Sequence, residues 1–98
     1  MHPEQAEEFD WDEYTVEKLA GKSPPITPHE AEEVYFNDPV WRPNKKNRAG
    51  DWKMIGRTDG GRLLTLFLRT LPDRRAIRII TGYEATAGDQ TEYEKERQ

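Results

Sequence analysis

The architecture of this chain is set by residues 52–81, WKMIGRTDGGRLLTLFLRTLPDRRAIRIIT. Aliphatic and aromatic residues concentrate in three runs of this stretch, which predict strands over 52–57, 62–69 and 75–81. The intervening Asp59-Gly60-Gly61 and Pro72-Asp73 are typical of tight turns. Because parallel strands need a long crossover and these connections are short, we expect an antiparallel meander. Val40-Trp41 predicts one further strand, which gives a sheet of three to four strands.

Two helices are expected before this sheet. Residues 13–20 carry apolar side chains at helical spacing, follow the N-cap residue Asp12 and end at a glycine. A second helix begins at Thr27, which forms a capping-box pattern with Glu30. This helix is expected to end near Asn37, where an Asp-Pro pair follows.

A third helix is expected at the C-terminal end, beginning at Thr86 with Asp89 as a second capping-box partner. The sequence therefore predicts one α+β domain over residues 1–98, with polar ends that fray at 1–8 and 95–98. Seven apolar residues of the second helix and the strands are expected to be buried. They are Val34, Trp52, Leu64, Leu66, Leu68, Ile77 and Ile79.

The composition excludes several classes of protein and site. The chain has no cysteine, which excludes disulfides, thiolate zinc sites and cysteine nucleophiles. No apolar run approaches the roughly 20 residues that a membrane helix needs. The first residues are acidic, whereas a signal peptide starts with a basic region. We therefore expect a protein of the cytoplasm that makes no use of a membrane.

Charge is segregated along the chain. Residues 1–40 have a net charge of −9, residues 41–81 of +8 and residues 82–98 of −3. Alternation along the predicted strands allows Arg57, Arg69 and Arg78 to share one face of the sheet, while Arg62 shares the other face with Leu64. Guanidinium groups suit phosphate because they donate paired hydrogen bonds and stay charged. Two interpretations stay open, since the basic segment either binds an anion or pairs with the acidic ends.

Several short segments stand out when they are taken together. The first half of the chain has Phe9-Asp10-Trp11-Asp12, Thr27-Pro28-His29-Glu30-Ala31 with Val34, and Asp38-Pro39. The second half has Ile55-Gly56-Arg57-Thr58, Gly61-Arg62-Leu63-Leu64, Ile77-Arg78-Ile79-Ile80 and Ala85-Thr86 followed by Tyr93-Glu94. In residues, order and approximate spacing these segments resemble the BrnT-type toxins, over about residues 9–94.

The resemblance implies a RelE-like fold, with two N-terminal helices and a C-terminal helix around an antiparallel sheet. It also implies the toxin of a bacterial type II toxin–antitoxin system, a metal-independent endoribonuclease that needs no cofactor. The expected partners are RNA and a cognate antitoxin with a ribbon-helix-helix domain. Whether the chain forms a homodimer stays open.

The resemblance further assigns residues to the reaction. Arg57, Arg62 and Arg78 stand at matching positions for stabilising the phosphorane that forms when RNA is cut. Tyr83 stands where relatives have an arginine after the last strand, and it is the fourth candidate catalytic residue. No metal ligands are expected. The candidate RNA-binding residues are all basic, and they are Lys22, Lys45, Lys46, Arg48, Lys53 and Arg69.

Three departures from the family pattern define two alternatives for function. Ser23-Pro24-Pro25 stands in place of Lys-His-Gly, Tyr83 in place of arginine, and Asp89-Gln90 in place of Glu-Arg. Either Tyr83 and Lys22 take over the lost roles, or the chain is a non-catalytic module of the same fold that binds RNA or protein.

Overall fold

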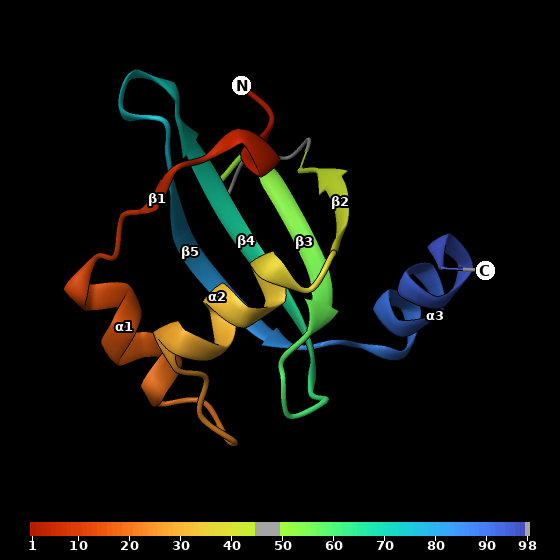
Figure 1. Ribbon diagram of the computed structural model, residues 1–98. Coiled ribbons are helices and arrows are strands. Elements are labelled where there is room, and N and C mark those ends of the chain that lie inside the picture. Colours follow the sequence, from red (N-terminus) through yellow and green to blue (C-terminus); the bar gives the residue numbers. More distant parts are fainter. Residues whose placement is uncertain (45–49, 98) are drawn as a thin grey trace.

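A five-stranded mixed sheet forms the centre of the structure, a computed structural model that describes residues 1–44 and 50–97 (Figure 1). The strands lie in the order β1-β5-β4-β3-β2. Their bounds are Glu8–Phe9 for β1, Val40–Pro43 for β2, Trp52–Arg57 for β3, Leu63–Leu71 for β4 and Ala76–Glu84 for β5.

The predicted meander is confirmed, because β2, β3, β4 and β5 pair antiparallel in chain order. A register shift between Phe67 and Leu68 leaves Ile80 as an extra residue on β5. Such a bulge changes which residues face each other, so the pairing of Arg69 with Arg78 depends on it.

The expectation of three to four strands, all antiparallel, was wrong at the N-terminus. The short strand β1 pairs in parallel with β5, and the whole chain between them serves as the crossover. The backbone N–H of Glu7 donates to the carbonyl of Arg75 at 2.7 Å, and that of Asp10 donates to the carbonyl of Ile77 at 2.8 Å. The start of the edge of β5, at Ala76 and Ile77, is thereby covered. A strand of two residues shows no alternation in its sequence from which this pairing could be predicted.

Three α-helices surround the sheet among the described residues, α1 at Glu13–Ala20, α2 at Pro28–Phe36 and α3 at Ala87–Glu96. Both predicted N-terminal starts are confirmed, since Asp12 accepts a hydrogen bond from the N–H of Tyr14 and the full capping box is present in α2. In α3 only half of the predicted box forms. The Thr86 hydroxyl accepts from the N–H of Asp89, but the Asp89 carboxylate bonds to the sheet instead.

The ends of the chain carry more regular structure than a frayed terminus would. A single 3-10 turn at Pro3–Gln5 buries Pro3, and Glu8 already belongs to β1. At the other end α3 reaches Glu96, while residue 98 lies outside the described residues. Among residues 1–44 and 50–97, no helix has the length and apolar character that crossing a bilayer requires.

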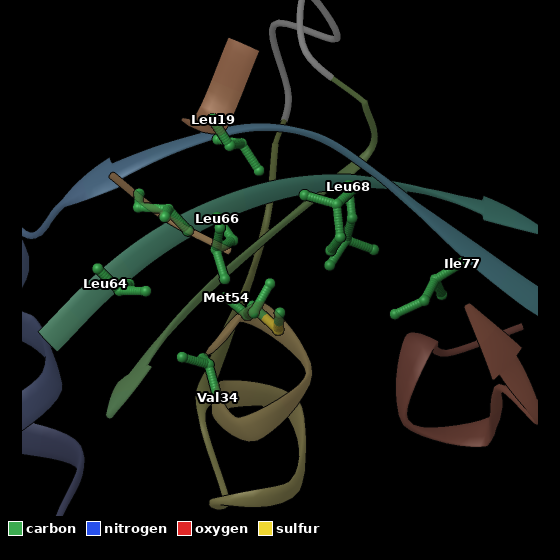
Figure 2. Close-up of a cluster of buried hydrophobic side chains, with 10 residues drawn as sticks. Leu19, Val34, Met54, Leu64, Leu66, Leu68 and Ile77 are labelled. Atoms are coloured by element: carbon green, nitrogen blue, oxygen red, sulfur yellow. The ribbon is translucent and has the colours of Figure 1, made fainter. Parts of the chain in front are cut away.

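The main core lies between one face of the sheet and the helices α1 and α2; in Figure 1 α2 crosses in front of the sheet and α1 lies at its lower left. Leu19 and Val34 come from the helices and meet Met54, Leu66 and their neighbours on the strands (Figure 2). Six of the seven residues predicted to be buried have 0–1% of their surface exposed, whereas Trp52 is only partly buried. Because α1 and α2 cover this face of the sheet, only the opposite face can present strand side chains to a partner.

Candidate functional site

The face of the sheet opposite the main core is covered only in part. The helix α3 packs over β3, where its Tyr93 joins Val40 and Ile55 in a second small core. Side chains of β4 and β5 lie beyond this contact on the same face, as strand alternation requires. We call this surface the open face, and its members are Phe67, Arg69, Arg78 and Tyr83.

Arg69 and Arg78 are direct partners across β4 and β5 on the open face. The register also places Arg57 on this side of the sheet, as the sequence predicted. However, Arg57 lies six residues along the ladder, about 20 Å from Arg69 at 3.3 Å per residue. Its guanidinium lies over the ring of Tyr93 and donates to the carbonyl of Gly61 at 2.8 Å. The three arginines therefore share a face without forming one cluster.

Arg78 is held by Asp10, the residue that follows β1. Its Nε donates to the Asp10 carboxylate at 3.0 Å, and Arg74 donates to the same carboxylate at 3.3 Å. The hydrogen bond from Arg78 is the largest cause that lowers the pKa of Asp10 below its usual 3.8, against the opposing effect of desolvation. Asp10 therefore stays charged at neutral pH and fixes the orientation of Arg78. Asp10 could not be assigned to this site from the sequence, because it is 68 residues away from Arg78 along the chain.

Phe67 and Tyr83 form an aromatic pair on the same face, with ring centroids 5.9 Å apart and planes tilted by 54°. Phe67 is two residues from Arg69 on β4, and Tyr83 lies opposite Thr65. Tyr83 is 36% exposed, and its pKa is raised from 10.0, first by burial and then by the charge of Asp89. Its phenol is therefore protonated at neutral pH, so it can donate a hydrogen bond but cannot act as a base. The predicted candidate Tyr83 thus lies on the open face with Arg69 and Arg78.

A polar cluster lies at the edge of the open face, beneath α3. The buried hydroxyl of Thr65 donates to Asp89 at 2.8 Å, and the ammonium of Lys53 lies 3.6 Å from Asp89 and 3.7 Å from Glu92. Lys53 is therefore already paired with carboxylates. Sequence reasoning missed Thr65 and Asp89 as members of the site, although a threonine amid the leucines of β4 was the signal available.

Arg62 lies away from the open face, contrary to its expected catalytic role. Its Nη1 donates to both oxygens of Glu30 at 3.0 and 2.8 Å and to the carbonyl of Pro25 at 2.8 Å, which joins β4 to the start of α2. Desolvation is the largest effect on Glu30 and would raise its pKa, but bonds from Thr27 and Arg62 outweigh it, so the pKa is lowered. The alternation of Arg62 with Leu64 had already placed it on the helix side.

Lys22, another predicted RNA-binding residue, does not join the open face. Lys22 follows α1, in the loop to α2 on the helix side of the sheet. Lys45, Lys46 and Arg48 lie outside the described residues. The interpretation that basic residues pair with the acidic ends is confirmed for most of the basic segment. These ion pairs involve Arg42, Lys53, Arg62, Arg74, Arg75 and Arg78.

No protein-family model matches this chain, and no curated protein matches its sequence. The open face itself combines two adjacent, tilted rings, one guanidinium oriented by a carboxylate, and a second guanidinium opposite it. Such a surface can hold a flat apolar group and an anion next to each other.

Proposed function

We propose that this protein is the toxin-like component of a type II toxin–antitoxin system and that it holds single-stranded RNA on the open face. The observation that carries the proposal is the placement of Arg69 opposite Arg78 beside the rings of Phe67 and Tyr83. The resemblance to BrnT-type toxins supports RNA as the ligand, a RelE-like fold, and a ribbon-helix-helix antitoxin as the partner.

An anion is favoured at this place because two guanidinium groups face each other. Like charges directly opposite in a sheet are destabilising. Asp10 offsets the charge of Arg78, but Arg69 is exposed and makes no ion pair or side-chain hydrogen bond with residues 1–44 or 50–97. A phosphate between the two arginines would accept hydrogen bonds from Arg69 and relieve the repulsion.

The adjacent rings favour a nucleic acid over a free anion. Bases of single-stranded RNA stack on aromatic side chains, and each such stack contributes about 1–3 kcal/mol. The partly exposed rings of Phe67 and Tyr83 lie on the same face as Arg69, so one nucleotide can use both kinds of contact. Double-stranded RNA keeps its bases stacked inside and would gain nothing from the rings.

Metal-independent RNA cleavage is the second candidate, and Tyr83 is the observation that favours it. Its protonated hydroxyl is on the same face as Arg78, so a proton donor and a phosphate-stabilising cation are both present. Binding has the stronger support, because the candidates Arg57 and Arg62 are held by Gly61 and Glu30 away from this place.

The proposal is tested by fluorescence polarisation with a labelled single-stranded RNA at several salt concentrations, with EDTA present. We expect Arg69→Ala to weaken binding about tenfold and to reduce the salt slope by about 0.7, the value for one lost phosphate contact. Arg75→Ala is the matched control, since it removes the same charge from an exposed arginine that precedes β5 and is paired with Glu7. Equal losses in both variants, or a parent protein that binds no RNA, would overturn the proposal.

Running the same samples on a denaturing gel shows whether the RNA is intact or cleaved, which distinguishes binding from cleavage. Intact RNA in the parent reaction supports a binding protein. Cleavage that is lost in Arg78→Ala and Tyr83→Phe but kept in His29→Ala supports the endoribonuclease, because His29 is exposed and lies on α2, across the sheet from the open face. Growth arrest on expression of the chain alone, relieved by a neighbouring ribbon-helix-helix gene, tests the toxin–antitoxin assignment.

A further inference from the structure

Phe36, the last residue of α2, is 74% exposed and stands between two hollows on the helix side of the sheet. The first hollow, of about 260 Å³, is walled by the rings of Tyr35, Phe36 and Trp41 and carries Glu4 and Asp38. The second, of about 330 Å³, lies between α2 and the turn from β3 to β4. What sets Phe36 apart is that its exposed ring lines both hollows, so it offers a partner a flat apolar surface with a concave surface on either side.

The second hollow is strongly acidic. Glu32, Glu33 and Asp59 line it together with Phe36, and no lysine or arginine is among its described lining residues. Neutral donors hold these carboxylates in place. Trp11 Nε1 donates to Glu32 at 2.8 Å, the N–H of Asp59 donates to Glu33 at 3.0 Å, and Asn37 donates to Asp59 at 2.9 Å.

These bonds orient the carboxylates without cancelling their charge. His29, whose Nε2 lies 3.0 Å from a carboxylate oxygen of Glu33, is the one histidine among the hollow's described lining residues. In the first hollow Asp38 has a loose ion pair with Arg97 at 3.6 Å, and Glu4 is mostly exposed beside His2. Both sides of the Phe36 ring therefore carry negative charge beside an aromatic wall.

We infer that Phe36 and its two hollows form a docking site for a basic peptide segment of a partner protein, with arginine side chains on either side of the ring. A guanidinium fits both features, because its flat face stacks on an aromatic ring and its edge pairs with carboxylates. Among residues 1–44 and 50–97 no group of histidine and carboxylate side chains has the arrangement of a metal site. A peptide would also cover the exposed ring, which a single small cation would leave in water.

This site is independent of RNA binding. Phe36 belongs to a helix that packs on the core face, whereas Arg69 and Tyr83 lie on the opposite face of the sheet. Both surfaces can be occupied at the same time. A basic partner held at Phe36 would leave the open face accessible.

The test uses a fluorescein-labelled glycine peptide that carries two arginines, and a matched peptide with citrulline, a neutral analogue, in their place. Polarisation at low salt is expected to show binding of the arginine peptide about tenfold tighter than that of the citrulline peptide. Phe36→Ala should weaken the arginine peptide about fivefold, as loss of a cation–π contact does. Tyr14→Ala is the control, since Tyr14 on α1 is 72% exposed and is absent from both hollows.

A second variant removes charge and keeps the hydrogen bonds. Glu32→Gln combined with Asp59→Asn retains acceptor oxygens for Trp11 and Asn37, so it should fold as the parent does and bind the arginine peptide about tenfold more weakly. Equal binding of the two peptides, an equal effect of Phe36→Ala and Tyr14→Ala, or no binding at about 1 mM peptide would each overturn the inference. Complete competition by an equal concentration of spermidine would also overturn it, because the site would then be one for small polyamines.

Discussion

Arg69 on β4 lies directly opposite Arg78 on β5, and only Arg78 is paired with a carboxylate among the described residues. Two adjacent cations on a sheet lower stability unless an anion lies near them. Asp10 offsets the charge of Arg78 alone, so the repulsion that remains from Arg69 is a cost to the free protein, and a bound phosphate would remove it. Stability and binding should respond in opposite directions when one of the two charges is removed.

The first prediction separates these two responses. Arg69→Gln should raise the free energy of unfolding by about 0.5 kcal/mol, because it removes the cross-strand repulsion. The same change should weaken RNA binding, because it removes a phosphate contact. Urea denaturation and polarisation measure the two quantities. Arg75→Gln serves as control, and its ion pair with Glu7 means that it should give no gain in stability. A loss of stability in Arg69→Gln would contradict the repulsion.

The second prediction concerns acid. The pKa of Asp10 is lowered from 3.8, chiefly by its hydrogen bond from Arg78, so the folded state binds this proton less readily than the unfolded chain does. The stabilisation from Asp10 is complete when the pH is well above 3.8, the usual pKa of the residue. It is lost as the pH falls below 3.8 and passes through the lower pKa that Asp10 has in the folded protein. Asp10→Asn should be less stable than the parent at about pH 6 and should lose less stability between about pH 5 and about pH 2. The free energy of unfolding of both proteins is measured against pH. If the difference between the parent and Asp10→Asn stays constant over this range, the ion pair contributes nothing to stability.

The third prediction distinguishes the ring of Tyr83 from its hydroxyl. For RNA binding, Tyr83→Phe should keep the parent affinity, while Tyr83→Ala should weaken it about tenfold because the stacking surface is lost. The pKa of Tyr83 is raised by burial, so binding should also be unchanged between about pH 7 and about pH 9. A large loss of affinity in Tyr83→Phe would show that the hydroxyl, and not the ring, holds the RNA.

The fourth prediction compares two glycines with the same backbone conformation. Gly50 and Gly61 have φ values of 93° and 92°, a region that costs a side chain about 1–2 kcal/mol. A Cβ on Gly61 would have nothing within 4 Å, whereas a Cβ on Gly50 would overlap the backbone carbonyl of Leu68. Gly61→Ala should therefore lower the free energy of unfolding by about 1–2 kcal/mol, and Gly50→Ala by roughly 3–5 kcal/mol. Equal losses in urea denaturation would mean that the backbone near Leu68 moves freely.

The helices and the meander could be predicted because local chemistry specifies them. Asp12 and Thr27 cap helices through bonds to residues two or three positions away, and the glycines at 60 and 61 make a turn wherever the fold places them. Such signals are complete within a short stretch of sequence. Their boundaries in the structure accordingly match those expected for α1 and β3.

The site was predicted less well because its contacts join distant parts of the chain. Arg78 and Asp10 meet only because β1 pairs with β5, and a two-residue strand has no alternation from which to predict it. Arg62 shows the opposite case. Its alternation with Leu64 indicated the helix side, and the resemblance to a toxin family led to a catalytic role that its bonds to Glu30 do not support.

The pairing of β1 with β5 also governs how the chain can fold while it is being made. Synthesis proceeds at about 5–20 residues per second, so β1 waits roughly 3–14 seconds after leaving the ribosome before residue 77 can pair with residue 9. When β5 has been made, β1 pairs with its first two residues, Ala76 and Ile77. A protein whose first ten residues are removed would expose the edge of β5 to other chains, and self-association through added strands is the defect expected of it.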